Sequence, residues 1–189
     1  MITEILLVIL FLFYFQIDKI SEYFFQFRHL SSEIIINCFN TSKYIDLIRI
    51  LTFNLFHIDI NHLLGNCITF IGFGAPLERV LNRISYFLYF KIILTLSILS
   101  GVFYVLFNYL IYCITGDVIH YNQLTCGFSG VLFGLQFIFY YLSLNDYYEA
   151  FKRTLIYLLY IKIFVANSSF IGHLAGLTSG YVVSRLYLN

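Results

Sequence analysis

Residues 125–134 read TCGFSGVLFG and place one serine, Ser129, among glycines at the start of an apolar run. Gly127 and Gly130 flank the serine, and Gly134 follows one helical turn after Gly130. A serine acts as a nucleophile only when a base lies close to it. Glycines remove the side chains that would keep a second helix at a distance. This stretch therefore predicts a nucleophile at a close contact between two helices.

A second stretch, GHLAG at residues 172–176, has the same build around a histidine, His173. Gly172 and Gly176 enclose it, and Gly180 lies one further turn along. A histidine is the commonest general base in proteins. Two glycine-lined helices, one with a serine and one with a histidine, predict a protease site inside a membrane.

Composition indicates the class of protein. Of the 189 residues, 60% are apolar and only 11% are charged, whereas soluble domains carry about 25% charged residues. We therefore expect a polytopic membrane protein in contact with the lipid bilayer, and the length allows a single domain over residues 1–189. The net charge of +1, without any basic run, excludes nucleic acid as a partner. The four cysteines show no paired spacing, which favours small buried hydrophobic residues over a metal or redox site.

Apolar runs separated by polar stretches predict an all-α fold with six membrane spans. We expect the spans at residues 4–17, 61–78, 86–113, 127–144, 154–168 and 171–188. The first run lacks a basic segment and a cleavage pattern, so it is expected to be a retained span rather than a signal peptide. Residues 18–60 form a long first loop, in which 43–56 has the apolar spacing of a helix at the membrane interface. Residues 145–153 are expected to be a charged connection.

The second predicted span contains two polar residues, His62 and Asn66. They are four residues apart and so share one helix face. Polar side chains at membrane depth are costly and normally face the protein interior. They could serve only as hydrogen bonds between helices, but the serine and histidine elsewhere favour a functional site.

Loop charges orient the six spans through the positive-inside rule. Basic residues follow the second, fourth and sixth spans or lie near their ends, namely Arg79, Arg83, Lys152, Arg153 and Arg185. The connections after the third and fifth spans contain no Lys or Arg. Both termini are therefore expected in the cytosol, with the long first loop outside.

In this orientation Ser129 lies at the extracytoplasmic, N-terminal end of the fourth span. The helix dipole is positive at that end, and the first-turn N–H groups are free to bind an oxyanion. His173, His62 and Asn66 also lie near span ends on that side. Four polar residues that are far apart in the sequence are thus expected at one depth.

With these residues in place, the chain resembles the rhomboid intramembrane serine proteases. The matching pieces occur in the family's order: His57 and His62 followed by Asn66, GAPLER at 74–79, GFSG at 127–130 and GHLAG at 172–176. Together they extend over about residues 54–181. Each piece alone is weak evidence, but the combination is highly specific.

The resemblance implies a six-helix bundle that cleaves the transmembrane segments of membrane-anchored proteins near their extracytoplasmic end. It implies Ser129 as the nucleophile and His173 as its general base. The oxyanion would be held by His62, Asn66 and the backbone N–H of Ser129. Gly127, Gly130, Gly134, Gly172 and Gly176 would be supporting glycines. No cofactor and no metal are expected, and the oligomeric state stays open.

The chain departs from the family pattern in two places. It has no tryptophan, so the Trp-Arg pair common in the family's first loop is absent. Phe133 stands four residues after the serine, where many relatives have a tyrosine that packs against the histidine. No Asp or Glu is expected at membrane depth near His173, which favours a Ser-His dyad over a triad.

Two alternatives remain at this point. One is a catalytically inactive rhomboid-like protein that binds membrane clients for degradation or trafficking, although such proteins usually lose the serine or the histidine. The other is a small transporter, for which the sequence halves lack the expected symmetry. Substrate access is expected past the fifth span, because Lys162 and Asn167 make it the least buried helix. The run at 167–170 resembles endoplasmic-reticulum rhomboids, with another endomembrane or the plasma membrane as alternatives.

Overall fold

The computed structural model of the chain describes residues 2–15, 27–165 and 168–189. Apart from an isolated bridge, every regular element in these ranges is helical. The elements in chain order are α1 (Ile2–Phe15), α3 (Ser32–Thr41), η1 (Tyr44–Ile48), α4 (Arg49–Thr52), η2 (Phe53–Leu55), α5 (Ile60–Ile84), α6 (Leu88–Thr115), α7 (Val118–Asn122), α8 (Ser129–Leu144), α9 (Tyr147–Phe164) and α10 (Phe170–Tyr187). The all-α class predicted from the sequence is confirmed.

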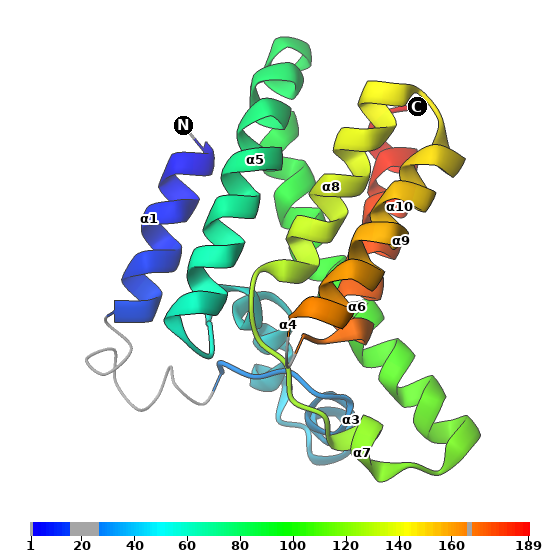
Figure 1. The fold of residues 1–189 in the computed structure, drawn as a ribbon. Helices are drawn as coiled ribbons and strands as arrows, with labels where there is room; N and C mark the ends of the chain where they lie inside the picture. Colours follow the sequence, from blue (N-terminus) through cyan, green and yellow to red (C-terminus); the bar gives the residue numbers. More distant parts are fainter. Residues whose placement is uncertain (1, 16–26, 166–167) are drawn as a thin grey trace.

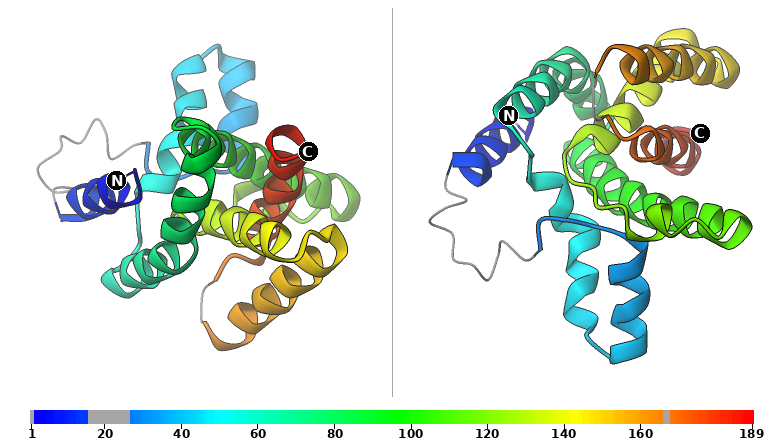
Figure 2. Two further views of the ribbon diagram at one scale, coloured as in Figure 1. Left: turned by 90° about the horizontal axis from the view of Figure 1, so that it is seen from above. Right: turned by 60° about the horizontal axis from the view of Figure 1, so that its bottom comes forward.

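Helix α8 is central to this arrangement. It packs against α5, α6, α9 and α10, and α1 lies outside α5 on the far side from α9 (Figures 1 and 2). Ten of its side chains or glycines are buried from Gly130 to Tyr141. The short elements α3, α4 and α7 gather at one end of the bundle, the end at which α8 begins. The helix that carries Ser129 is therefore enclosed by the others.

The contact between α8 and α10 is made backbone to backbone. A Cβ atom added to Gly176 would lie 2.8 Å from the carbonyl carbon of Gly130, and closer still to its oxygen. One added to Gly180 would lie 2.7 Å from the carbonyl oxygen of Gly134. Such an approach is possible only for residues without side chains, as in the small-residue interfaces of membrane helices. The glycines of the two stretches thus face each other.

Helix α1 is fastened to α5 by a buried carboxylate. The backbone N–H groups of Ile2 and Thr3 donate to the two oxygens of Glu78, at 2.6 and 3.0 Å. The hydroxyl of Thr3 is also 3.1 Å from that of Tyr89 on α6. A carboxylate at a helix N-terminus pairs with N–H groups that have no partner within the helix. Glu78 therefore has a structural role in holding α1 against α5.

The helices extend beyond the expected spans at several places; α5, for example, continues to Ile84. Two differences concern stretches that were expected to be connections. α9 begins at Tyr147, inside the stretch 145–153 that was interpreted as a connection, because Asp146 caps it by accepting from the N–H groups of Tyr148 and Glu149. In the first loop, 43–56 is a run of short helical turns rather than one interfacial helix, and α3 was not expected. Its N-cap is Ser31, whose hydroxyl accepts from Ile34. Some predicted segments lie partly outside the described residues, namely 16–17 of the first span, 18–26 of the long first loop and 166–167 of the fifth span.

One described helix, α6, is long and apolar enough to cross a membrane on its own. Helices α1 and α8 are apolar but shorter. The remaining long helices, α5, α9 and α10, contain polar and charged residues, and these lower their mean hydropathy. Apolar helices that enclose a few buried polar residues are typical of an integral membrane protein.

The close approach of α8 and α10 leads to a test with a matched control. We expect Gly176→Ala to lower the free energy of unfolding by about 1–3 kcal/mol, because the added methyl group would overlap the backbone of Gly130. Gly72→Ala, on α5, has nothing within 4 Å of the added atom, so it is expected to be neutral or stabilising by roughly 0.5–1 kcal/mol. Denaturant titration in detergent micelles measures both. Equal effects of the two substitutions would contradict the glycine contact.

Candidate active site

Ser129 is the first residue of α8, and its side chain is partly exposed. The preceding residue, Phe128, provides no side-chain cap for the helix. The first N–H groups of a helix have no partner within it. The serine hydroxyl therefore lies beside free backbone donors, at the positive end of the helix dipole.

His173 of α10 is brought to the same face of α8 by an aromatic stack. Its ring lies on that of Phe133, with the centroids 4.3 Å apart and the planes at 22°. Phe133 is one helical turn after Ser129 and so lies on the same side of α8. The histidine is 6% exposed, and its Nδ1 atom has no hydrogen-bond partner among the described residues. The position that a family tyrosine would fill thus retains the ring contact.

Two further contacts hold the histidine and its stacking partner. The Phe133 ring also lies 5.6 Å from that of Tyr157 on α9. At the start of α10, the hydroxyl of Ser169 accepts from the N–H of Gly172 at 3.1 Å. Capping of this kind fixes where a helix begins. It therefore fixes the angular position of His173 around α10.

His62 approaches the serine turn through Gly127. Asp59 caps α5 by accepting from the N–H of His62 at 2.8 Å, which places the histidine in the first turn of that helix. Gly127 has a φ of +119°, in the region that side chains other than hydrogen disfavour. A Cβ atom there would lie 2.9 Å from Nε2 of His62. Gly127 therefore lets the imidazole lie directly against the backbone that leads into Ser129.

Asn66 lies one turn along α5 and is 7% exposed. Its Nδ2 atom is 2.8 Å from Nε2 of His57, and that nitrogen also accepts from the N–H of Phe128 at 3.5 Å. An amide NH₂ has two hydrogens, so one remains after the bond to His57. The family resemblance implies an oxyanion role for Asn66, and the structure adds a bond that orients its amide.

His57 had no role in the sequence-based interpretation beyond its place in the motif. It lies before α5, is 6% exposed, and packs edge to face against His62 with centroids 5.1 Å apart. Burial, together with the neighbouring His62, lowers the pKa of His57 to about 3. His57 is therefore neutral at physiological pH and can accept hydrogen bonds. Its hydrogen bonds to Asn66 and Phe128 are visible only in the three-dimensional structure.

The first loop reaches the serine stretch at two points. Leu30 and Thr125 form an antiparallel bridge, with N–H to oxygen distances of 3.0 and 2.9 Å. The N–H of Gly127 donates to the carbonyl of Phe53 at 2.9 Å. These bonds fix the backbone two and four residues before Ser129.

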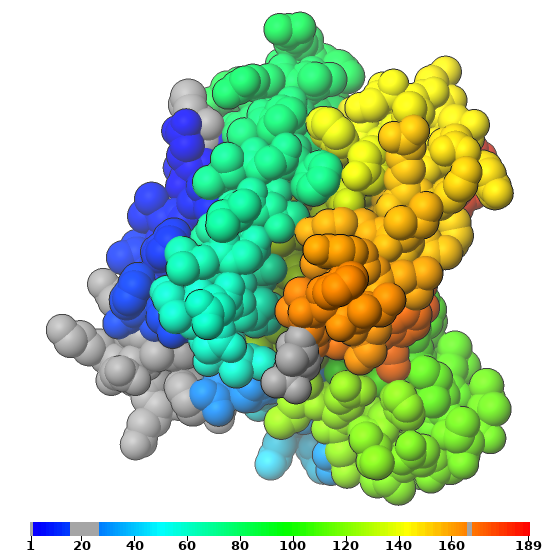
Figure 3. Space-filling view, in the orientation of Figure 1, coloured from blue at the N-terminus to red at the C-terminus, as the bar shows by residue number. Residues whose placement is uncertain are grey.

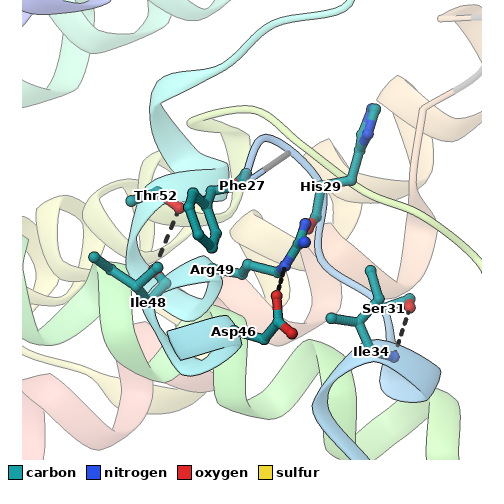
Figure 4. Close-up of polar contacts among 8 residues, drawn as sticks. All are labelled: Phe27, His29, Ser31, Ile34, Asp46, Ile48, Arg49 and Thr52. Atoms are coloured by element: carbon teal, nitrogen blue, oxygen red, sulfur yellow. Dashed lines mark hydrogen bonds and ion pairs between the residues drawn. The ribbon is translucent and has the colours of Figure 1, made fainter. Parts of the chain in front are cut away.

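Arg49 in turn holds the part of the loop that makes the bridge. Its side chain forms an ion pair with Asp46 at 2.7 Å, donates to the carbonyl of His29 at 3.3 Å and lies 5.2 Å from the ring centre of Phe27. The hydroxyl of Thr52 donates to the carbonyl of Phe27 at 3.0 Å. Figure 4 shows Arg49 reaching between Asp46 and the chain segment that carries Phe27 and His29. An arginine–phenylalanine contact thus anchors a loop that lacks tryptophan.

The chain is similar in sequence to several rhomboid proteins. It is 28% identical over 166 residues to "Rhomboid-like protein 14, mitochondrial" of Arabidopsis thaliana, covering 82% of this chain and 48% of that protein. It is 31% identical over 150 residues to human "Rhomboid-related protein 4", covering 72% and 45%. It is 27% identical over 162 residues to "Rhomboid-type serine protease 2" of Debaryomyces hansenii, covering 76% and 51%. The chain spans about half the length of these curated relatives.

The family itself is shown by a second comparison. The model of the rhomboid domain matches residues 45–189, which include Arg49, His62, Asn66, Ser129 and His173. The match covers more than half of the chain, and it contains every helix from α4 to α10. The motifs, the helical fold and both comparisons agree that this chain belongs to the rhomboid family.

Proposed function

We propose that this chain is an intramembrane serine endopeptidase in which Ser129 is the nucleophile and His173 the general base. The observation that supports it best is the stack of His173 on Phe133. That stack brings an imidazole from α10 to the serine's face of α8, one turn from Ser129. A serine becomes reactive when such a base can take its proton.

The reaction would follow the two steps of a serine hydrolase. His173 takes the hydroxyl proton as the oxygen of Ser129 bonds to the scissile carbonyl carbon, and it returns that proton to the leaving amine as the peptide C–N bond breaks. Water then attacks the acyl-enzyme ester, with His173 as base, and releases the second product. Because Nδ1 of His173 has no hydrogen-bond partner in the described ranges, we propose a dyad without a carboxylate.

The negative oxygen of the tetrahedral intermediates needs hydrogen-bond donors. The first-turn N–H groups of α8, His62 and the second amide hydrogen of Asn66 all lie around the Gly127–Ser129 turn. Donors that are already in place need no reorganisation during the reaction. His57 would act as a positioning residue, because its bond to Asn66 fixes the amide plane.

The substrates that fit this site are transmembrane proteins. We propose that α1, α5, α6, α8, α9 and α10 cross the membrane, with both chain ends in the cytosol and Ser129 near the outer surface. Substrate would reach the site from the lipid, past α9, whose outer side exposes Ile156, Ile163 and Phe164. Asn167, one of the two residues that suggested this route, lies outside the described residues. An endomembrane location such as the endoplasmic reticulum remains part of the proposal.

The dyad can be tested by removing each of its members. Ser129→Ala and His173→Ala are each expected to abolish cleavage of a membrane-anchored reporter, and the double variant should be no worse, because the two residues act as one unit. Labelling of Ser129 by a fluorophosphonate should be lost in Ser129→Ala. Ser143→Ala, at an exposed serine near the end of the same helix, is the matched control. Cleavage by Ser129→Ala at the wild-type rate would favour an inactive, client-binding rhomboid relative with a contaminating protease.

The role of Asn66 is separated from substrate binding by kinetics. Losing one oxyanion donor costs about 10²–10³ in kcat. We expect Asn66→Ala to lower kcat by about that factor with little change in KM, whereas Asn61→Ala, at an exposed asparagine on the same helix, should change neither. A rise in KM at constant kcat would place Asn66 in substrate binding instead.

The proposed substrate class predicts where cleavage occurs. A helical peptide bond is shielded by its own hydrogen bonds, so the scissile region must unwind, and Gly or Pro nearby favours unwinding. A Gly-Pro pair moved stepwise through a model transmembrane segment should give most cleavage when it lies near the extracytoplasmic end. Mass spectrometry locates the cleaved bond. Cleavage at the cytosolic end, or equal cleavage of a uniform poly-leucine segment, would contradict the proposal.

A further inference from the structure

Gln136 is a polar residue in the middle of α8 to which the proposed mechanism assigns no role. Its side chain is 1% exposed. Nε2 lies at the outer limit of hydrogen bonding, 3.5 Å from the hydroxyl of Tyr140, and Oε1 is buried with no partner in the part of the chain that the structure describes. The two ends of an amide are assigned from such contacts. In either orientation, one end of the Gln136 amide is unpaired.

An unpaired amide at this depth needs an explanation. Nearly all buried polar groups in folded proteins have a hydrogen-bond partner. The requirement is stronger in a membrane, where no bulk water can replace the missing partner. If position 136 served only to pack α8, leucine or methionine there would make the protein more stable than glutamine does. Gln136 therefore points to a partner that joins the protein during its function.

The helix geometry places Gln136 below the nucleophile. It follows Ser129 by seven residues, and seven residues of helix fall about 20° short of two full turns. Both residues therefore lie on one face of α8, about 10 Å apart along the helix axis. The glycines at 130 and 134 lie on a different face, against α10. Gln136 is thus not part of the helix–helix contact described above.

The neighbours of this face come from the two helices on either side of it. On one side, the ring of Phe73 on α5 lies 6.0 Å from that of Tyr140. On the other side, Tyr157 of α9 packs against Phe133. In the space-filling view α5 and α9 lie to either side, with atoms of α8 visible between them (Figure 3). Gln136 faces the seam through which a segment from the lipid would meet Ser129.

We propose that Gln136 is a specificity-determining residue that accepts a hydrogen bond from an uncharged polar side chain of the substrate, namely Ser, Thr, Asn or Gln. This inference rests on the proposed protease function and names a feature of its substrates. The 10 Å between Ser129 and Gln136 corresponds to about three residues of extended chain or seven of helix. The polar residue is therefore placed three to seven residues deeper in the membrane than the scissile bond.

Specificity of this type is physically reasonable because the amide is buried. A site built to hydrogen-bond a polar group rejects an apolar analogue, since the site's own polar atom then stays unpaired. In water such a contact would be exchanged for solvent at little net gain.

The test compares matched substrates and matched enzymes. Each substrate carries the same Gly-Pro pair near its outer end and either Asn or Leu at one position, three to seven residues deeper. Wild-type protein in proteoliposomes is expected to cleave the best Asn substrate about tenfold faster than its Leu counterpart. Gln136→Met, which has nearly the same shape without hydrogen-bonding groups, should cleave the two equally, with the Leu substrate cleaved at the wild-type rate.

Two further variants guard against a structural explanation. Gln136→Leu repeats the apolar change with another side-chain shape. Tyr140→Phe removes the one partner that the amide has among the described residues, so this variant should keep the preference for Asn. Unfolding midpoints and fluorophosphonate labelling of Ser129 show whether each variant is folded and reactive. An equal loss on Asn and Leu substrates in Gln136→Met would show that Gln136 is structural, or binds a water molecule, and would overturn the inference.

A binding measurement separates this inference from the proposed function. In detergent, the Ser129→Ala protein is expected to bind the fluorescently labelled Asn segment about tenfold more tightly than the Leu segment. The double variant Ser129→Ala/Gln136→Met should bind the two segments equally. Wild-type cleavage of all substrates without preference for Asn overturns the role of Gln136 and leaves the protease intact. Preferential binding without any cleavage overturns the protease and leaves the recognition. If neither the preference for Asn nor any cleavage is observed, both proposals are overturned.

Discussion

The close contact between the backbones of α8 and α10 is the constraint on which the rest of the structure depends. Gly176 meets Gly130, and Gly180 meets Gly134, at distances that leave no room for a Cβ atom. Any larger residue would separate the axes, and the His173 ring would then lose its stack on Phe133. The same four glycines therefore provide helix packing and bring His173 to the face of α8 that carries Ser129. Since lipid offers no hydrophobic drive for helix association, such tight packing is also what keeps α10 in place.

The other side of the site depends on the loop that precedes α5. Arg49 holds the segment around His29, the neighbouring Leu30 pairs with Thr125, and the carbonyl of Phe53 holds Gly127. The backbone before Ser129 is thus fixed by a structure outside the bundle. His57 continues this link, because one nitrogen contacts both Asn66 and Phe128. Helix packing sets the position of His173, whereas loop contacts set the position of the turn that leads into Ser129.

What could be predicted from the sequence was local or repeated. The glycines around Ser129 and His173, the polar pair on α5 and the all-α class are visible as short patterns, and the family follows from their order. The first loop could not be predicted, because the bond from Arg49 to His29 and the bridge from Leu30 to Thr125 join residues 20 and 95 positions apart. The start of α9 was missed although its cap, Asp146, was readable. There the charged residues at 149–153 were given more weight than the capping signal.

The aromatic contact at Phe133 positions His173, a residue with few polar partners. A histidine base usually has its second nitrogen oriented by a hydrogen bond, but Nδ1 of His173 has none among the residues whose placement is described. The ring is instead positioned by contact over its face, between the Phe133 stack and the helix start that Ser169 caps. A hydroxyl at position 133 would add a polar group to this stack without being needed for it. The orientation of the His173 ring therefore comes from its contact with the Phe133 ring rather than from a hydrogen bond to residue 133.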